Sequence, residues 1–147
     1  MEKKRNDLKV YSILVLVFVL ISLGRMIADV CINGFGDIGQ LPEGVTESVA
    51  NVALVVVWVI GIIFLLPQIY IGIAGLKQAK NPTSGRAHIV WAFILTALSA
   101  LSLISCIVDI TKVYTYDKLL SALDTLVDVI LFTSYYVVAR QIAAEVK

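Results

Sequence analysis

Four long apolar stretches dominate the pattern of hydrophobic and polar positions along the chain. They cover residues 10–32, 49–76, 87–110 and 119–139, and polar segments separate them. At a rise of about 1.5 Å per residue, each stretch is long enough to cross about 30 Å of hydrocarbon as an α-helix. Membrane strands would be about ten residues long and would alternate in polarity, and these stretches do neither. The pattern therefore predicts an all-α integral membrane protein.

The polar segments between the apolar stretches carry turn signals. Residues 33–44 are rich in Gly and Pro, residues 77–86 contain Asn-Pro and Ser-Gly steps, and residues 111–118 are short. Short connections make consecutive helices antiparallel. We therefore expect a single domain over residues 1–147, folded as an antiparallel bundle of four transmembrane helices.

The composition supports a membrane environment for the chain. Apolar residues make up 59% of the sequence and charged residues 16%, against about 25% charged residues in ordinary globular proteins. Mean hydropathy is +0.91. A small soluble domain leaves too much of its surface exposed to hide so many apolar groups. The net charge of +1 provides no basic patch for nucleic acid.

The basic residues predict the orientation in the membrane. If the chain crosses four times, nine Lys and Arg residues fall on one side, and only Lys112 and Lys118 fall on the other. Loops rich in Lys and Arg remain in the cytoplasm, so both termini are expected on the cytoplasmic side of the plasma membrane. The alternative is that the first stretch is a cleaved signal peptide. Its length and the lack of a convincing A-x-A site favour a retained span.

Several charged residues lie inside the apolar stretches or at their edges, where a charge at the bilayer centre costs about 2.5–3.5 kcal/mol. Their depth follows from the helical rise. Arg25 lies about 24 Å beyond Lys9, and Asp124 lies about 24 Å before Arg140, so both are expected at one level in the outer half. The complete set is Arg25, Asp29, Asp109, Asp124 and Asp128.

Helical periodicity places further polar residues on the same faces as these charges. The predicted result is a small hydrophilic cavity open to the outside. Its expected lining is Arg25, Asp29, Asn51, Ser102, Asp109, Ser121, Asp124 and Asp128. The inner half of the bundle is expected to be ordinary apolar packing, with His88 among the aromatic rings at the inner boundary.

One arginine cannot neutralise four carboxylates, and two interpretations of this acidic set remain open. In the functional interpretation, the set binds a cation or an amine-bearing ligand, or relays protons through Asp124 and Asp128. In the structural interpretation, Arg25 pairs with Asp124 or Asp128, and small residues allow close helix packing.

A faint repeat links the first and third apolar stretches. The pattern S-L-x-x-x-I-x-D-[V/I] occurs at residues 22–30 and again at residues 102–110. The repeat predicts two tandem hairpins related by an axis along the membrane normal.

The reactive residues argue against an enzyme. Cys31 and Cys106 stand alone on different stretches, either as free thiols or as one disulfide, and His88 is the single histidine. No metal-ligand spacing and no nucleophile–base pair is visible, so no metal, cofactor or catalytic residue is expected. Pro67 lies inside the second stretch, as an ordinary kink or as a gating hinge.

Two functions follow as expectations. The first is a non-enzymatic protein that binds or helps transport a cation or cationic small molecule, with a homo-oligomer needed for transport because the bundle is small. The second is an accessory, immunity-type or interaction protein whose polar stripes pack helices and dock a partner membrane protein.

Overall fold

The computed structural model describes residues 1–33 and 47–146, and the described chain is helical throughout apart from short connections. The helices are α1 (Glu2–Asn33), α2 (Glu47–Lys80), α3 (Ala87–Lys112) and α4 (Tyr116–Glu145). All four are long and apolar enough to cross a membrane. The all-helical prediction with four candidate spans is therefore confirmed. Apart from Asn33, the predicted first connection at residues 33–44 lies outside the described residues.

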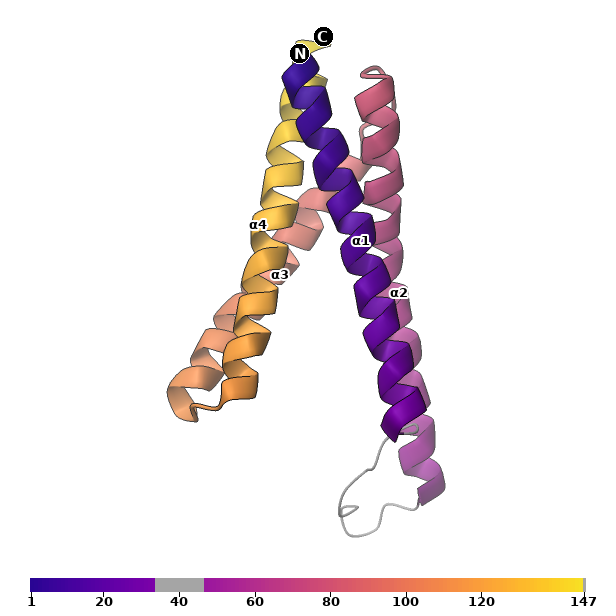
Figure 1. The fold of residues 1–147 in the computed structure, drawn as a ribbon, viewed down its shortest axis with the longest axis vertical. Coiled ribbons are helices and arrows are strands. Elements are labelled where there is room, and N and C mark those ends of the chain that lie inside the picture. The colour runs from indigo at the N-terminus through magenta and orange to yellow at the C-terminus, as the bar shows by residue number, and fades with distance from the viewer. Residues whose placement is uncertain (34–46, 147) are drawn as a thin grey trace.

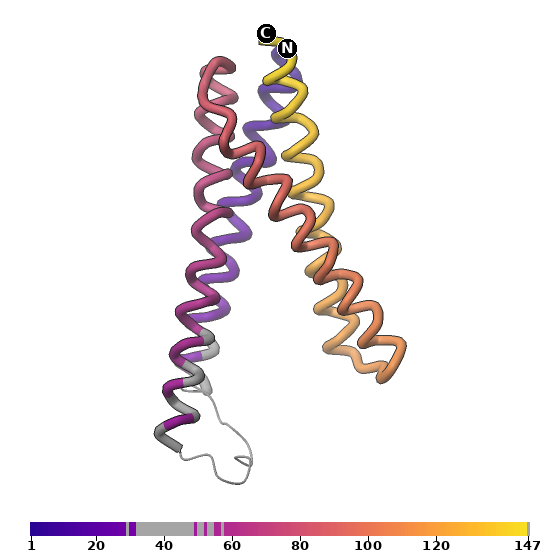
Figure 2. Tube along the Cα trace, turned by 180° about the vertical axis from the view of Figure 1, so that it is seen from behind, coloured from indigo at the N-terminus to yellow at the C-terminus, as the bar shows by residue number. Residues whose placement is uncertain are grey.

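The helices form two hairpins, α1 with α2 and α3 with α4. Contacts within each hairpin are far more extensive than the contacts of α1 with α4 and of α2 with α3. The hairpins meet at the end that carries both chain termini and residues 81–86, and they diverge toward the other end (Figure 1; Figure 2). We call these the closed end and the open end.

The hydrophobic core lies at the closed end. With the exception of Ala122, the buried apolar residues come from α1 before residue 20, α2 after residue 64, α3 before residue 96 and α4 after residue 130. Many large apolar side chains elsewhere are exposed, as lipid-facing side chains would be; Leu20 is 67% and Leu101 is 64% exposed. The core therefore fixes the two hairpins against each other at one end only.

Two glycines bring α1 and α2 together in this core. A Cβ atom added to Gly72 would lie 2.7 Å from the side chain of Leu16. A Cβ atom added to Gly75 would collide with Ser12 Oγ and lie 2.5 Å from Tyr135 Oη. At both positions a neighbouring side chain occupies the space that a methyl group would need.

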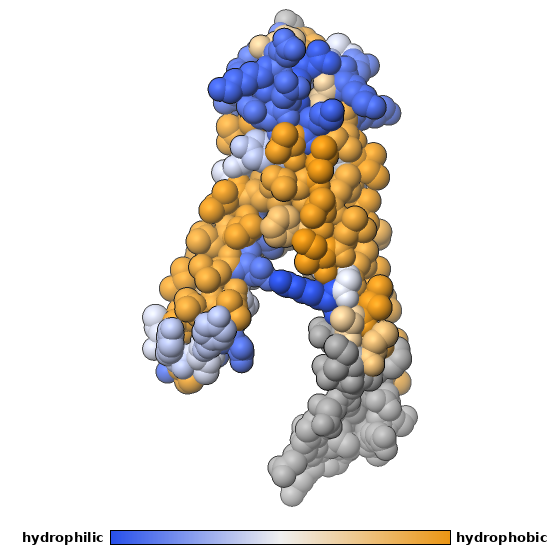
Figure 3. All heavy atoms as spheres, viewed as in Figure 1, coloured by the Kyte–Doolittle hydropathy of each residue, from blue (hydrophilic) through white to orange (hydrophobic). Residues whose placement is uncertain are grey.

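Polar contacts hold the rim of the closed end together. Arg5 of α1 donates from Nε to the carbonyl oxygen of Ala79 at 2.7 Å and from Nη2 to that of Lys80 at 2.8 Å. These carbonyls belong to the last turn of α2, which has no helical partners for them. Lys4 pairs with Glu145 of α4. Figure 3 shows the resulting hydrophilic cap above a broad apolar band.

Pro67 does not end α2, which continues through it from Glu47 to Lys80. Whether it acts as an ordinary kink or as a gating hinge stays a prediction.

Candidate functional site

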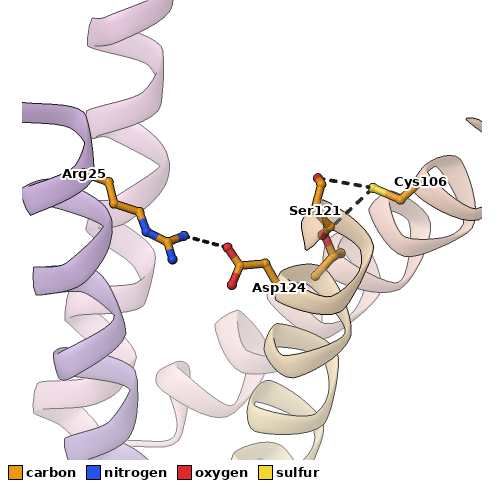
Figure 4. A network of polar contacts seen from close by, with 5 residues as sticks. Arg25, Cys106, Ser121 and Asp124 are labelled. Carbon is orange, nitrogen blue, oxygen red and sulfur yellow. Dashed lines mark hydrogen bonds and ion pairs between the residues drawn. The ribbon is translucent and has the colours of Figure 1, made fainter. Parts of the chain in front are cut away.

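The two hairpins are linked near the open end by an ion pair. Nη1 of Arg25 on α1 lies 2.7 Å from Oδ2 of Asp124 on α4, and the two side chains reach toward each other across the gap between the helices (Figure 4). The sequence predicted that these two residues lie at one depth. It also allowed Arg25 to pair with either Asp124 or Asp128, and the structure contains the pair with Asp124. The side chains are 66% and 59% exposed.

A pocket of about 410 Å³ surrounds this pair, and we call it the cleft site. Its polar side consists of Arg25, Ser121 and Asp124, whereas its apolar side consists of leucine and valine side chains from α4. The lining is Arg25, Leu120, Ser121, Leu123, Asp124 and Val127. The cleft site thus combines one ion pair with an apolar wall.

Behind the ion pair, α4 contacts α3 through small polar groups. The Cys106 sulfur lies 3.9 Å from the hydroxyl of Ser121 and 3.9 Å from that of Thr125 (Figure 4). The Thr125 hydroxyl donates to the Ser121 carbonyl oxygen at 2.8 Å. Cys31 and Cys106 are both free, so of the two alternatives for these cysteines the structure contains free thiols.

Asp109 does not join the Arg25–Asp124 pair. Its carboxylate lies 3.9 Å from Nζ of Lys112, one turn further along α3. Ser102 is exposed. The ion pairs of the described residues therefore divide the predicted acidic set instead of joining it around one arginine.

Of the three remaining members of the predicted set, the structure describes the side chain of Asp128 only. Asp128 lies one turn from Asp124 on α4, on the same face, and is half-buried. Within the described part of the chain, no ion pair or hydrogen bond reaches its carboxylate. Asp29 and Asn51 lie on α1 and α2, but their side chains are outside the described residues.

Metal binding has little support at the cleft site. In residues 1–33 and 47–146, as far as they are described, no group of three His, Cys, Asp or Glu side chains could hold a metal ion. Among the described residues, Asp124 lines the cleft site, and Asp128 lies one turn away from it on α4.

A second polar cluster lies in the core of the closed end, and each helix contributes one member. Ser12, Gln78, His88 and Tyr135 are at most 1% exposed; we call them the closed-end network. Nε2 of Gln78 donates to the carbonyl oxygen of Ala139 at 3.2 Å. Its Oε1 therefore accepts, and it lies 2.8 Å from Nε2 of His88. A neutral His88 ring that donates to this oxygen carries its proton on Nε2.

The other two members hold α1, α2 and α4 together. Tyr135 donates from its hydroxyl to the carbonyl oxygen of Ile71 at 2.6 Å. Ser12 donates to the Leu8 carbonyl oxygen within its own helix at 2.7 Å. The Tyr135 ring meets the His88 ring edge to face, with centroids 6.2 Å apart. Because buried polar groups that are fully paired tolerate few alternative arrangements, this network specifies how the hairpins meet.

The closed-end network corrects two predictions. The apolar packing predicted for this half is present but incomplete, because the core also contains buried polar groups, and His88 is a buried interhelical group instead of a boundary ring. The physical reason is that α2 continues to Lys80, so Gln78 lies in the helix and not in the predicted connection at residues 77–86. The spacing of Gly72, Gly75 and Gln78 by three residues was the available signal, because it places a polar amide on the helix face with the closest packing.

Tyr135→Phe is expected to lower the free energy of unfolding by about 1–2 kcal/mol, because it removes a buried hydrogen bond without changing the packed ring. The measurement is an SDS or thermal unfolding curve of the purified protein in detergent. Tyr116→Phe is the matched control, since Tyr116 is 69% exposed, and it should unfold like the wild type. Equal stability of the two variants would show that the Tyr135–Ile71 bond does not stabilise the closed end.

The chain matches no known protein family, no curated protein and no solved structure. Its function has to be inferred from its own residues.

Proposed function

We propose that this chain is a non-enzymatic, multi-pass protein of the plasma membrane that binds a lipophilic organic cation at Asp124. In this proposal the four helices cross the bilayer as an antiparallel bundle, and the cleft site faces outward. The basic residues support the orientation. Lys3, Arg5, Lys77, Arg86 and Arg140 all belong to the closed end, and Lys-rich and Arg-rich segments remain in the cytoplasm.

The observation that carries the proposal is the exposed ion pair in the cleft site. In this proposal water fills the gap between the hairpins, and an ion pair in contact with water contributes at most about 1 kcal/mol. Asp124 is therefore held loosely by Arg25, and a ligand cation can take the place of the guanidinium. After the exchange, the water in the gap would solvate the Arg25 guanidinium, whose side chain is 66% exposed on the gap between the helices.

The charges and the wall of the cleft site indicate the class of ligand. The cleft site contains one acid, Asp124, and one base, Arg25, and a second acid, Asp128, lies one turn further along α4 on the same face. Leu120, Leu123 and Val127 form the apolar wall. This combination favours a cation with an apolar body over a hydrated metal ion, because burying the apolar body adds to the attraction of the carboxylates.

Transport of the cation across the membrane would require more than binding it. A bundle of four helices has little room for a translocation path of its own, so transport would require a homo-oligomer. Binding at Asp124 requires one chain only.

Arg25→Gln distinguishes this proposal from a purely structural ion pair. If Arg25 competes with the ligand, its removal should increase binding of tetraphenylphosphonium, a lipophilic organic cation, by about fivefold, the equivalent of about 1 kcal/mol. The shift in melting temperature with the probe should then be larger in the variant than in the wild type. No shift in either protein, or a smaller shift in the variant, would contradict cation binding at Asp124.

A second candidate is an accessory or immunity-type protein that docks another membrane protein. The observation in its favour is an apolar groove between α1 and α4 with a volume of about 220 Å³. Its lining includes Leu14, Phe18 and Ile130, and the side chains of a partner transmembrane helix would fit it. This candidate predicts that neither the wild type nor Arg25→Gln responds to the cation probe.

A further inference from the structure

A second pocket with unused charge lies at the closed end, between the start of α3 and the end of α4. Its volume is about 370 Å³, and its lining is Arg86, Ile89, Val90, Arg140, Ala143 and Ala144. Two arginines thus line a pocket that also has an apolar floor. We call it the arginine pocket.

The two arginines have no acidic partner in the described part of the chain. The ion pairs there are Lys4–Glu145, Arg25–Asp124 and Lys112–Asp109. The first turn of α3 contains no acidic residue, and Glu145, the acid that follows Arg140 on α4, is already engaged by Lys4. Arg140 makes one neutral contact, a donation to the Tyr136 hydroxyl at 3.3 Å. The arginine pocket is therefore positively charged and uncompensated.

The apolar floor of the arginine pocket continues along α3 toward the open end. Val90 is 60% and Phe93 is 55% exposed, and they lie on one helix face because they are three residues apart. The Phe93 ring packs against Tyr136 of α4 at 5.6 Å between centroids. A ligand in the arginine pocket thus meets charge at one end and an apolar strip along the helices beyond it.

We infer that the arginine pocket binds an anionic phospholipid. Its phosphate would lie between Arg86 and Arg140, and an acyl chain would lie along Val90 and Phe93. Arginine suits this role because its planar fork donates two parallel hydrogen bonds to phosphate oxygens. The pocket lies at the first turn of α3 and the last turns of α4, at the closed end of both apolar helices, which is the depth of lipid headgroups if this end faces the cytoplasm. Basic pockets between transmembrane helices on that side bind anionic headgroups.

A larger pocket of the closed end, with a volume of about 560 Å³, is the weaker candidate for this role. It includes Arg5, Lys9 and Lys80, but also Glu2, which repels a phosphate. In addition, the Arg5 guanidinium already donates to two carbonyl groups of α2. The arginine pocket has neither disadvantage.

The test compares lipid binding by the full chain in detergent, measured by native mass spectrometry with added phosphatidylglycerol or phosphatidylcholine. We expect the wild type to retain phosphatidylglycerol in preference. R86Q/R140Q should weaken this binding by roughly thirtyfold, equivalent to about 2 kcal/mol for two basic residues at the headgroup level. The control K3Q/K77Q removes the same charge from the same end outside the arginine pocket and should change the binding by at most about threefold.

Three results would overturn the inference: equal retention of both lipids by the wild type, equal losses in the two double variants, or displacement of the lipid by millimolar inorganic phosphate. If R86Q/R140Q does not fold, the single variants R86Q and R140Q replace it, each with an expected loss of about fivefold. Unchanged binding in both single variants would equally overturn it. The inference requires membrane insertion but not cation binding, and the cation probe at Asp124 fails or succeeds independently of these variants.

Discussion

Gly75→Leu is expected to prevent the two hairpins from assembling at the closed end, and Gly75→Ala is expected to cost about 3 kcal/mol of stability. A Cβ atom at this position lies 2.5 Å from Tyr135 Oη and 2.6 Å from Tyr135 Cε2. The neighbours of this Cβ atom are the side chains of Tyr135 and Ser12. Moving either one would break a buried hydrogen bond, because Tyr135 donates to the Ile71 carbonyl oxygen and Ser12 donates to the Leu8 carbonyl oxygen. The extra carbon therefore breaks buried hydrogen bonds or separates α1, α2 and α4.

Gly24→Ala is the matched control for this prediction. It makes the same chemical change inside α1, but nothing lies within 4 Å of the added Cβ atom, so unfolding should be unchanged or slightly improved by the better helix propensity of alanine. The measurement is thermal melting in detergent together with size-exclusion chromatography. If Gly75→Ala melts like Gly24→Ala, the close packing of the closed end is not what stabilises the fold.

Asp124→Asn is expected to weaken binding of tetraphenylphosphonium by about ten- to a hundredfold, because it removes the Coulomb attraction between a carboxylate and a cation, which is about 1–4 kcal/mol between bulk water and a protein surface. Asparagine has nearly the same shape, and both groups of the original pair are exposed. The variant should therefore fold like the wild type. Its melting temperature without the probe should be almost unchanged, while the stabilisation by the probe should disappear.

Asp109→Asn controls for the loss of one carboxylate near the open end. Asp109 is paired with Lys112 on α3 and does not line the cleft site, so the variant should bind the probe like the wild type. Loss of binding in both variants would indicate an effect of overall charge instead of a site at Asp124.

Much of the fold was predictable because its causes are local to each helix. The length of the apolar stretches predicts four helices, and all four are present. The helix ends were less predictable. Residues 1–9 and 77–80 read as polar flanks, yet α1 begins at Glu2 and α2 continues to Lys80, because Arg5 and Gln78 find partners on neighbouring helices.

The depth of the site residues along their helices was predictable, but the neighbouring helix that each side chain contacts was not. Counting the helical rise places Arg25 and Asp124 at one level, and they pair across the gap. The same counting cannot say which helix a side chain meets, so it grouped Asp109 with acids of other helices, whereas its partner Lys112 lies three residues further along α3. The divergence of the hairpins follows from long-range packing around Gly75 and Tyr135, which periodicity within one helix does not contain.

The most direct test of cation binding at Asp124 is equilibrium binding of radiolabelled tetraphenylphosphonium to four purified proteins in detergent. The predicted order of affinity is Arg25→Gln first, wild type and Asp109→Asn next, and Asp124→Asn last. Arg25→Gln should differ from the wild type by about fivefold, and Asp124→Asn by about tenfold or more. Equal binding by all four proteins, or no binding to the wild type, would contradict a cation site at Asp124.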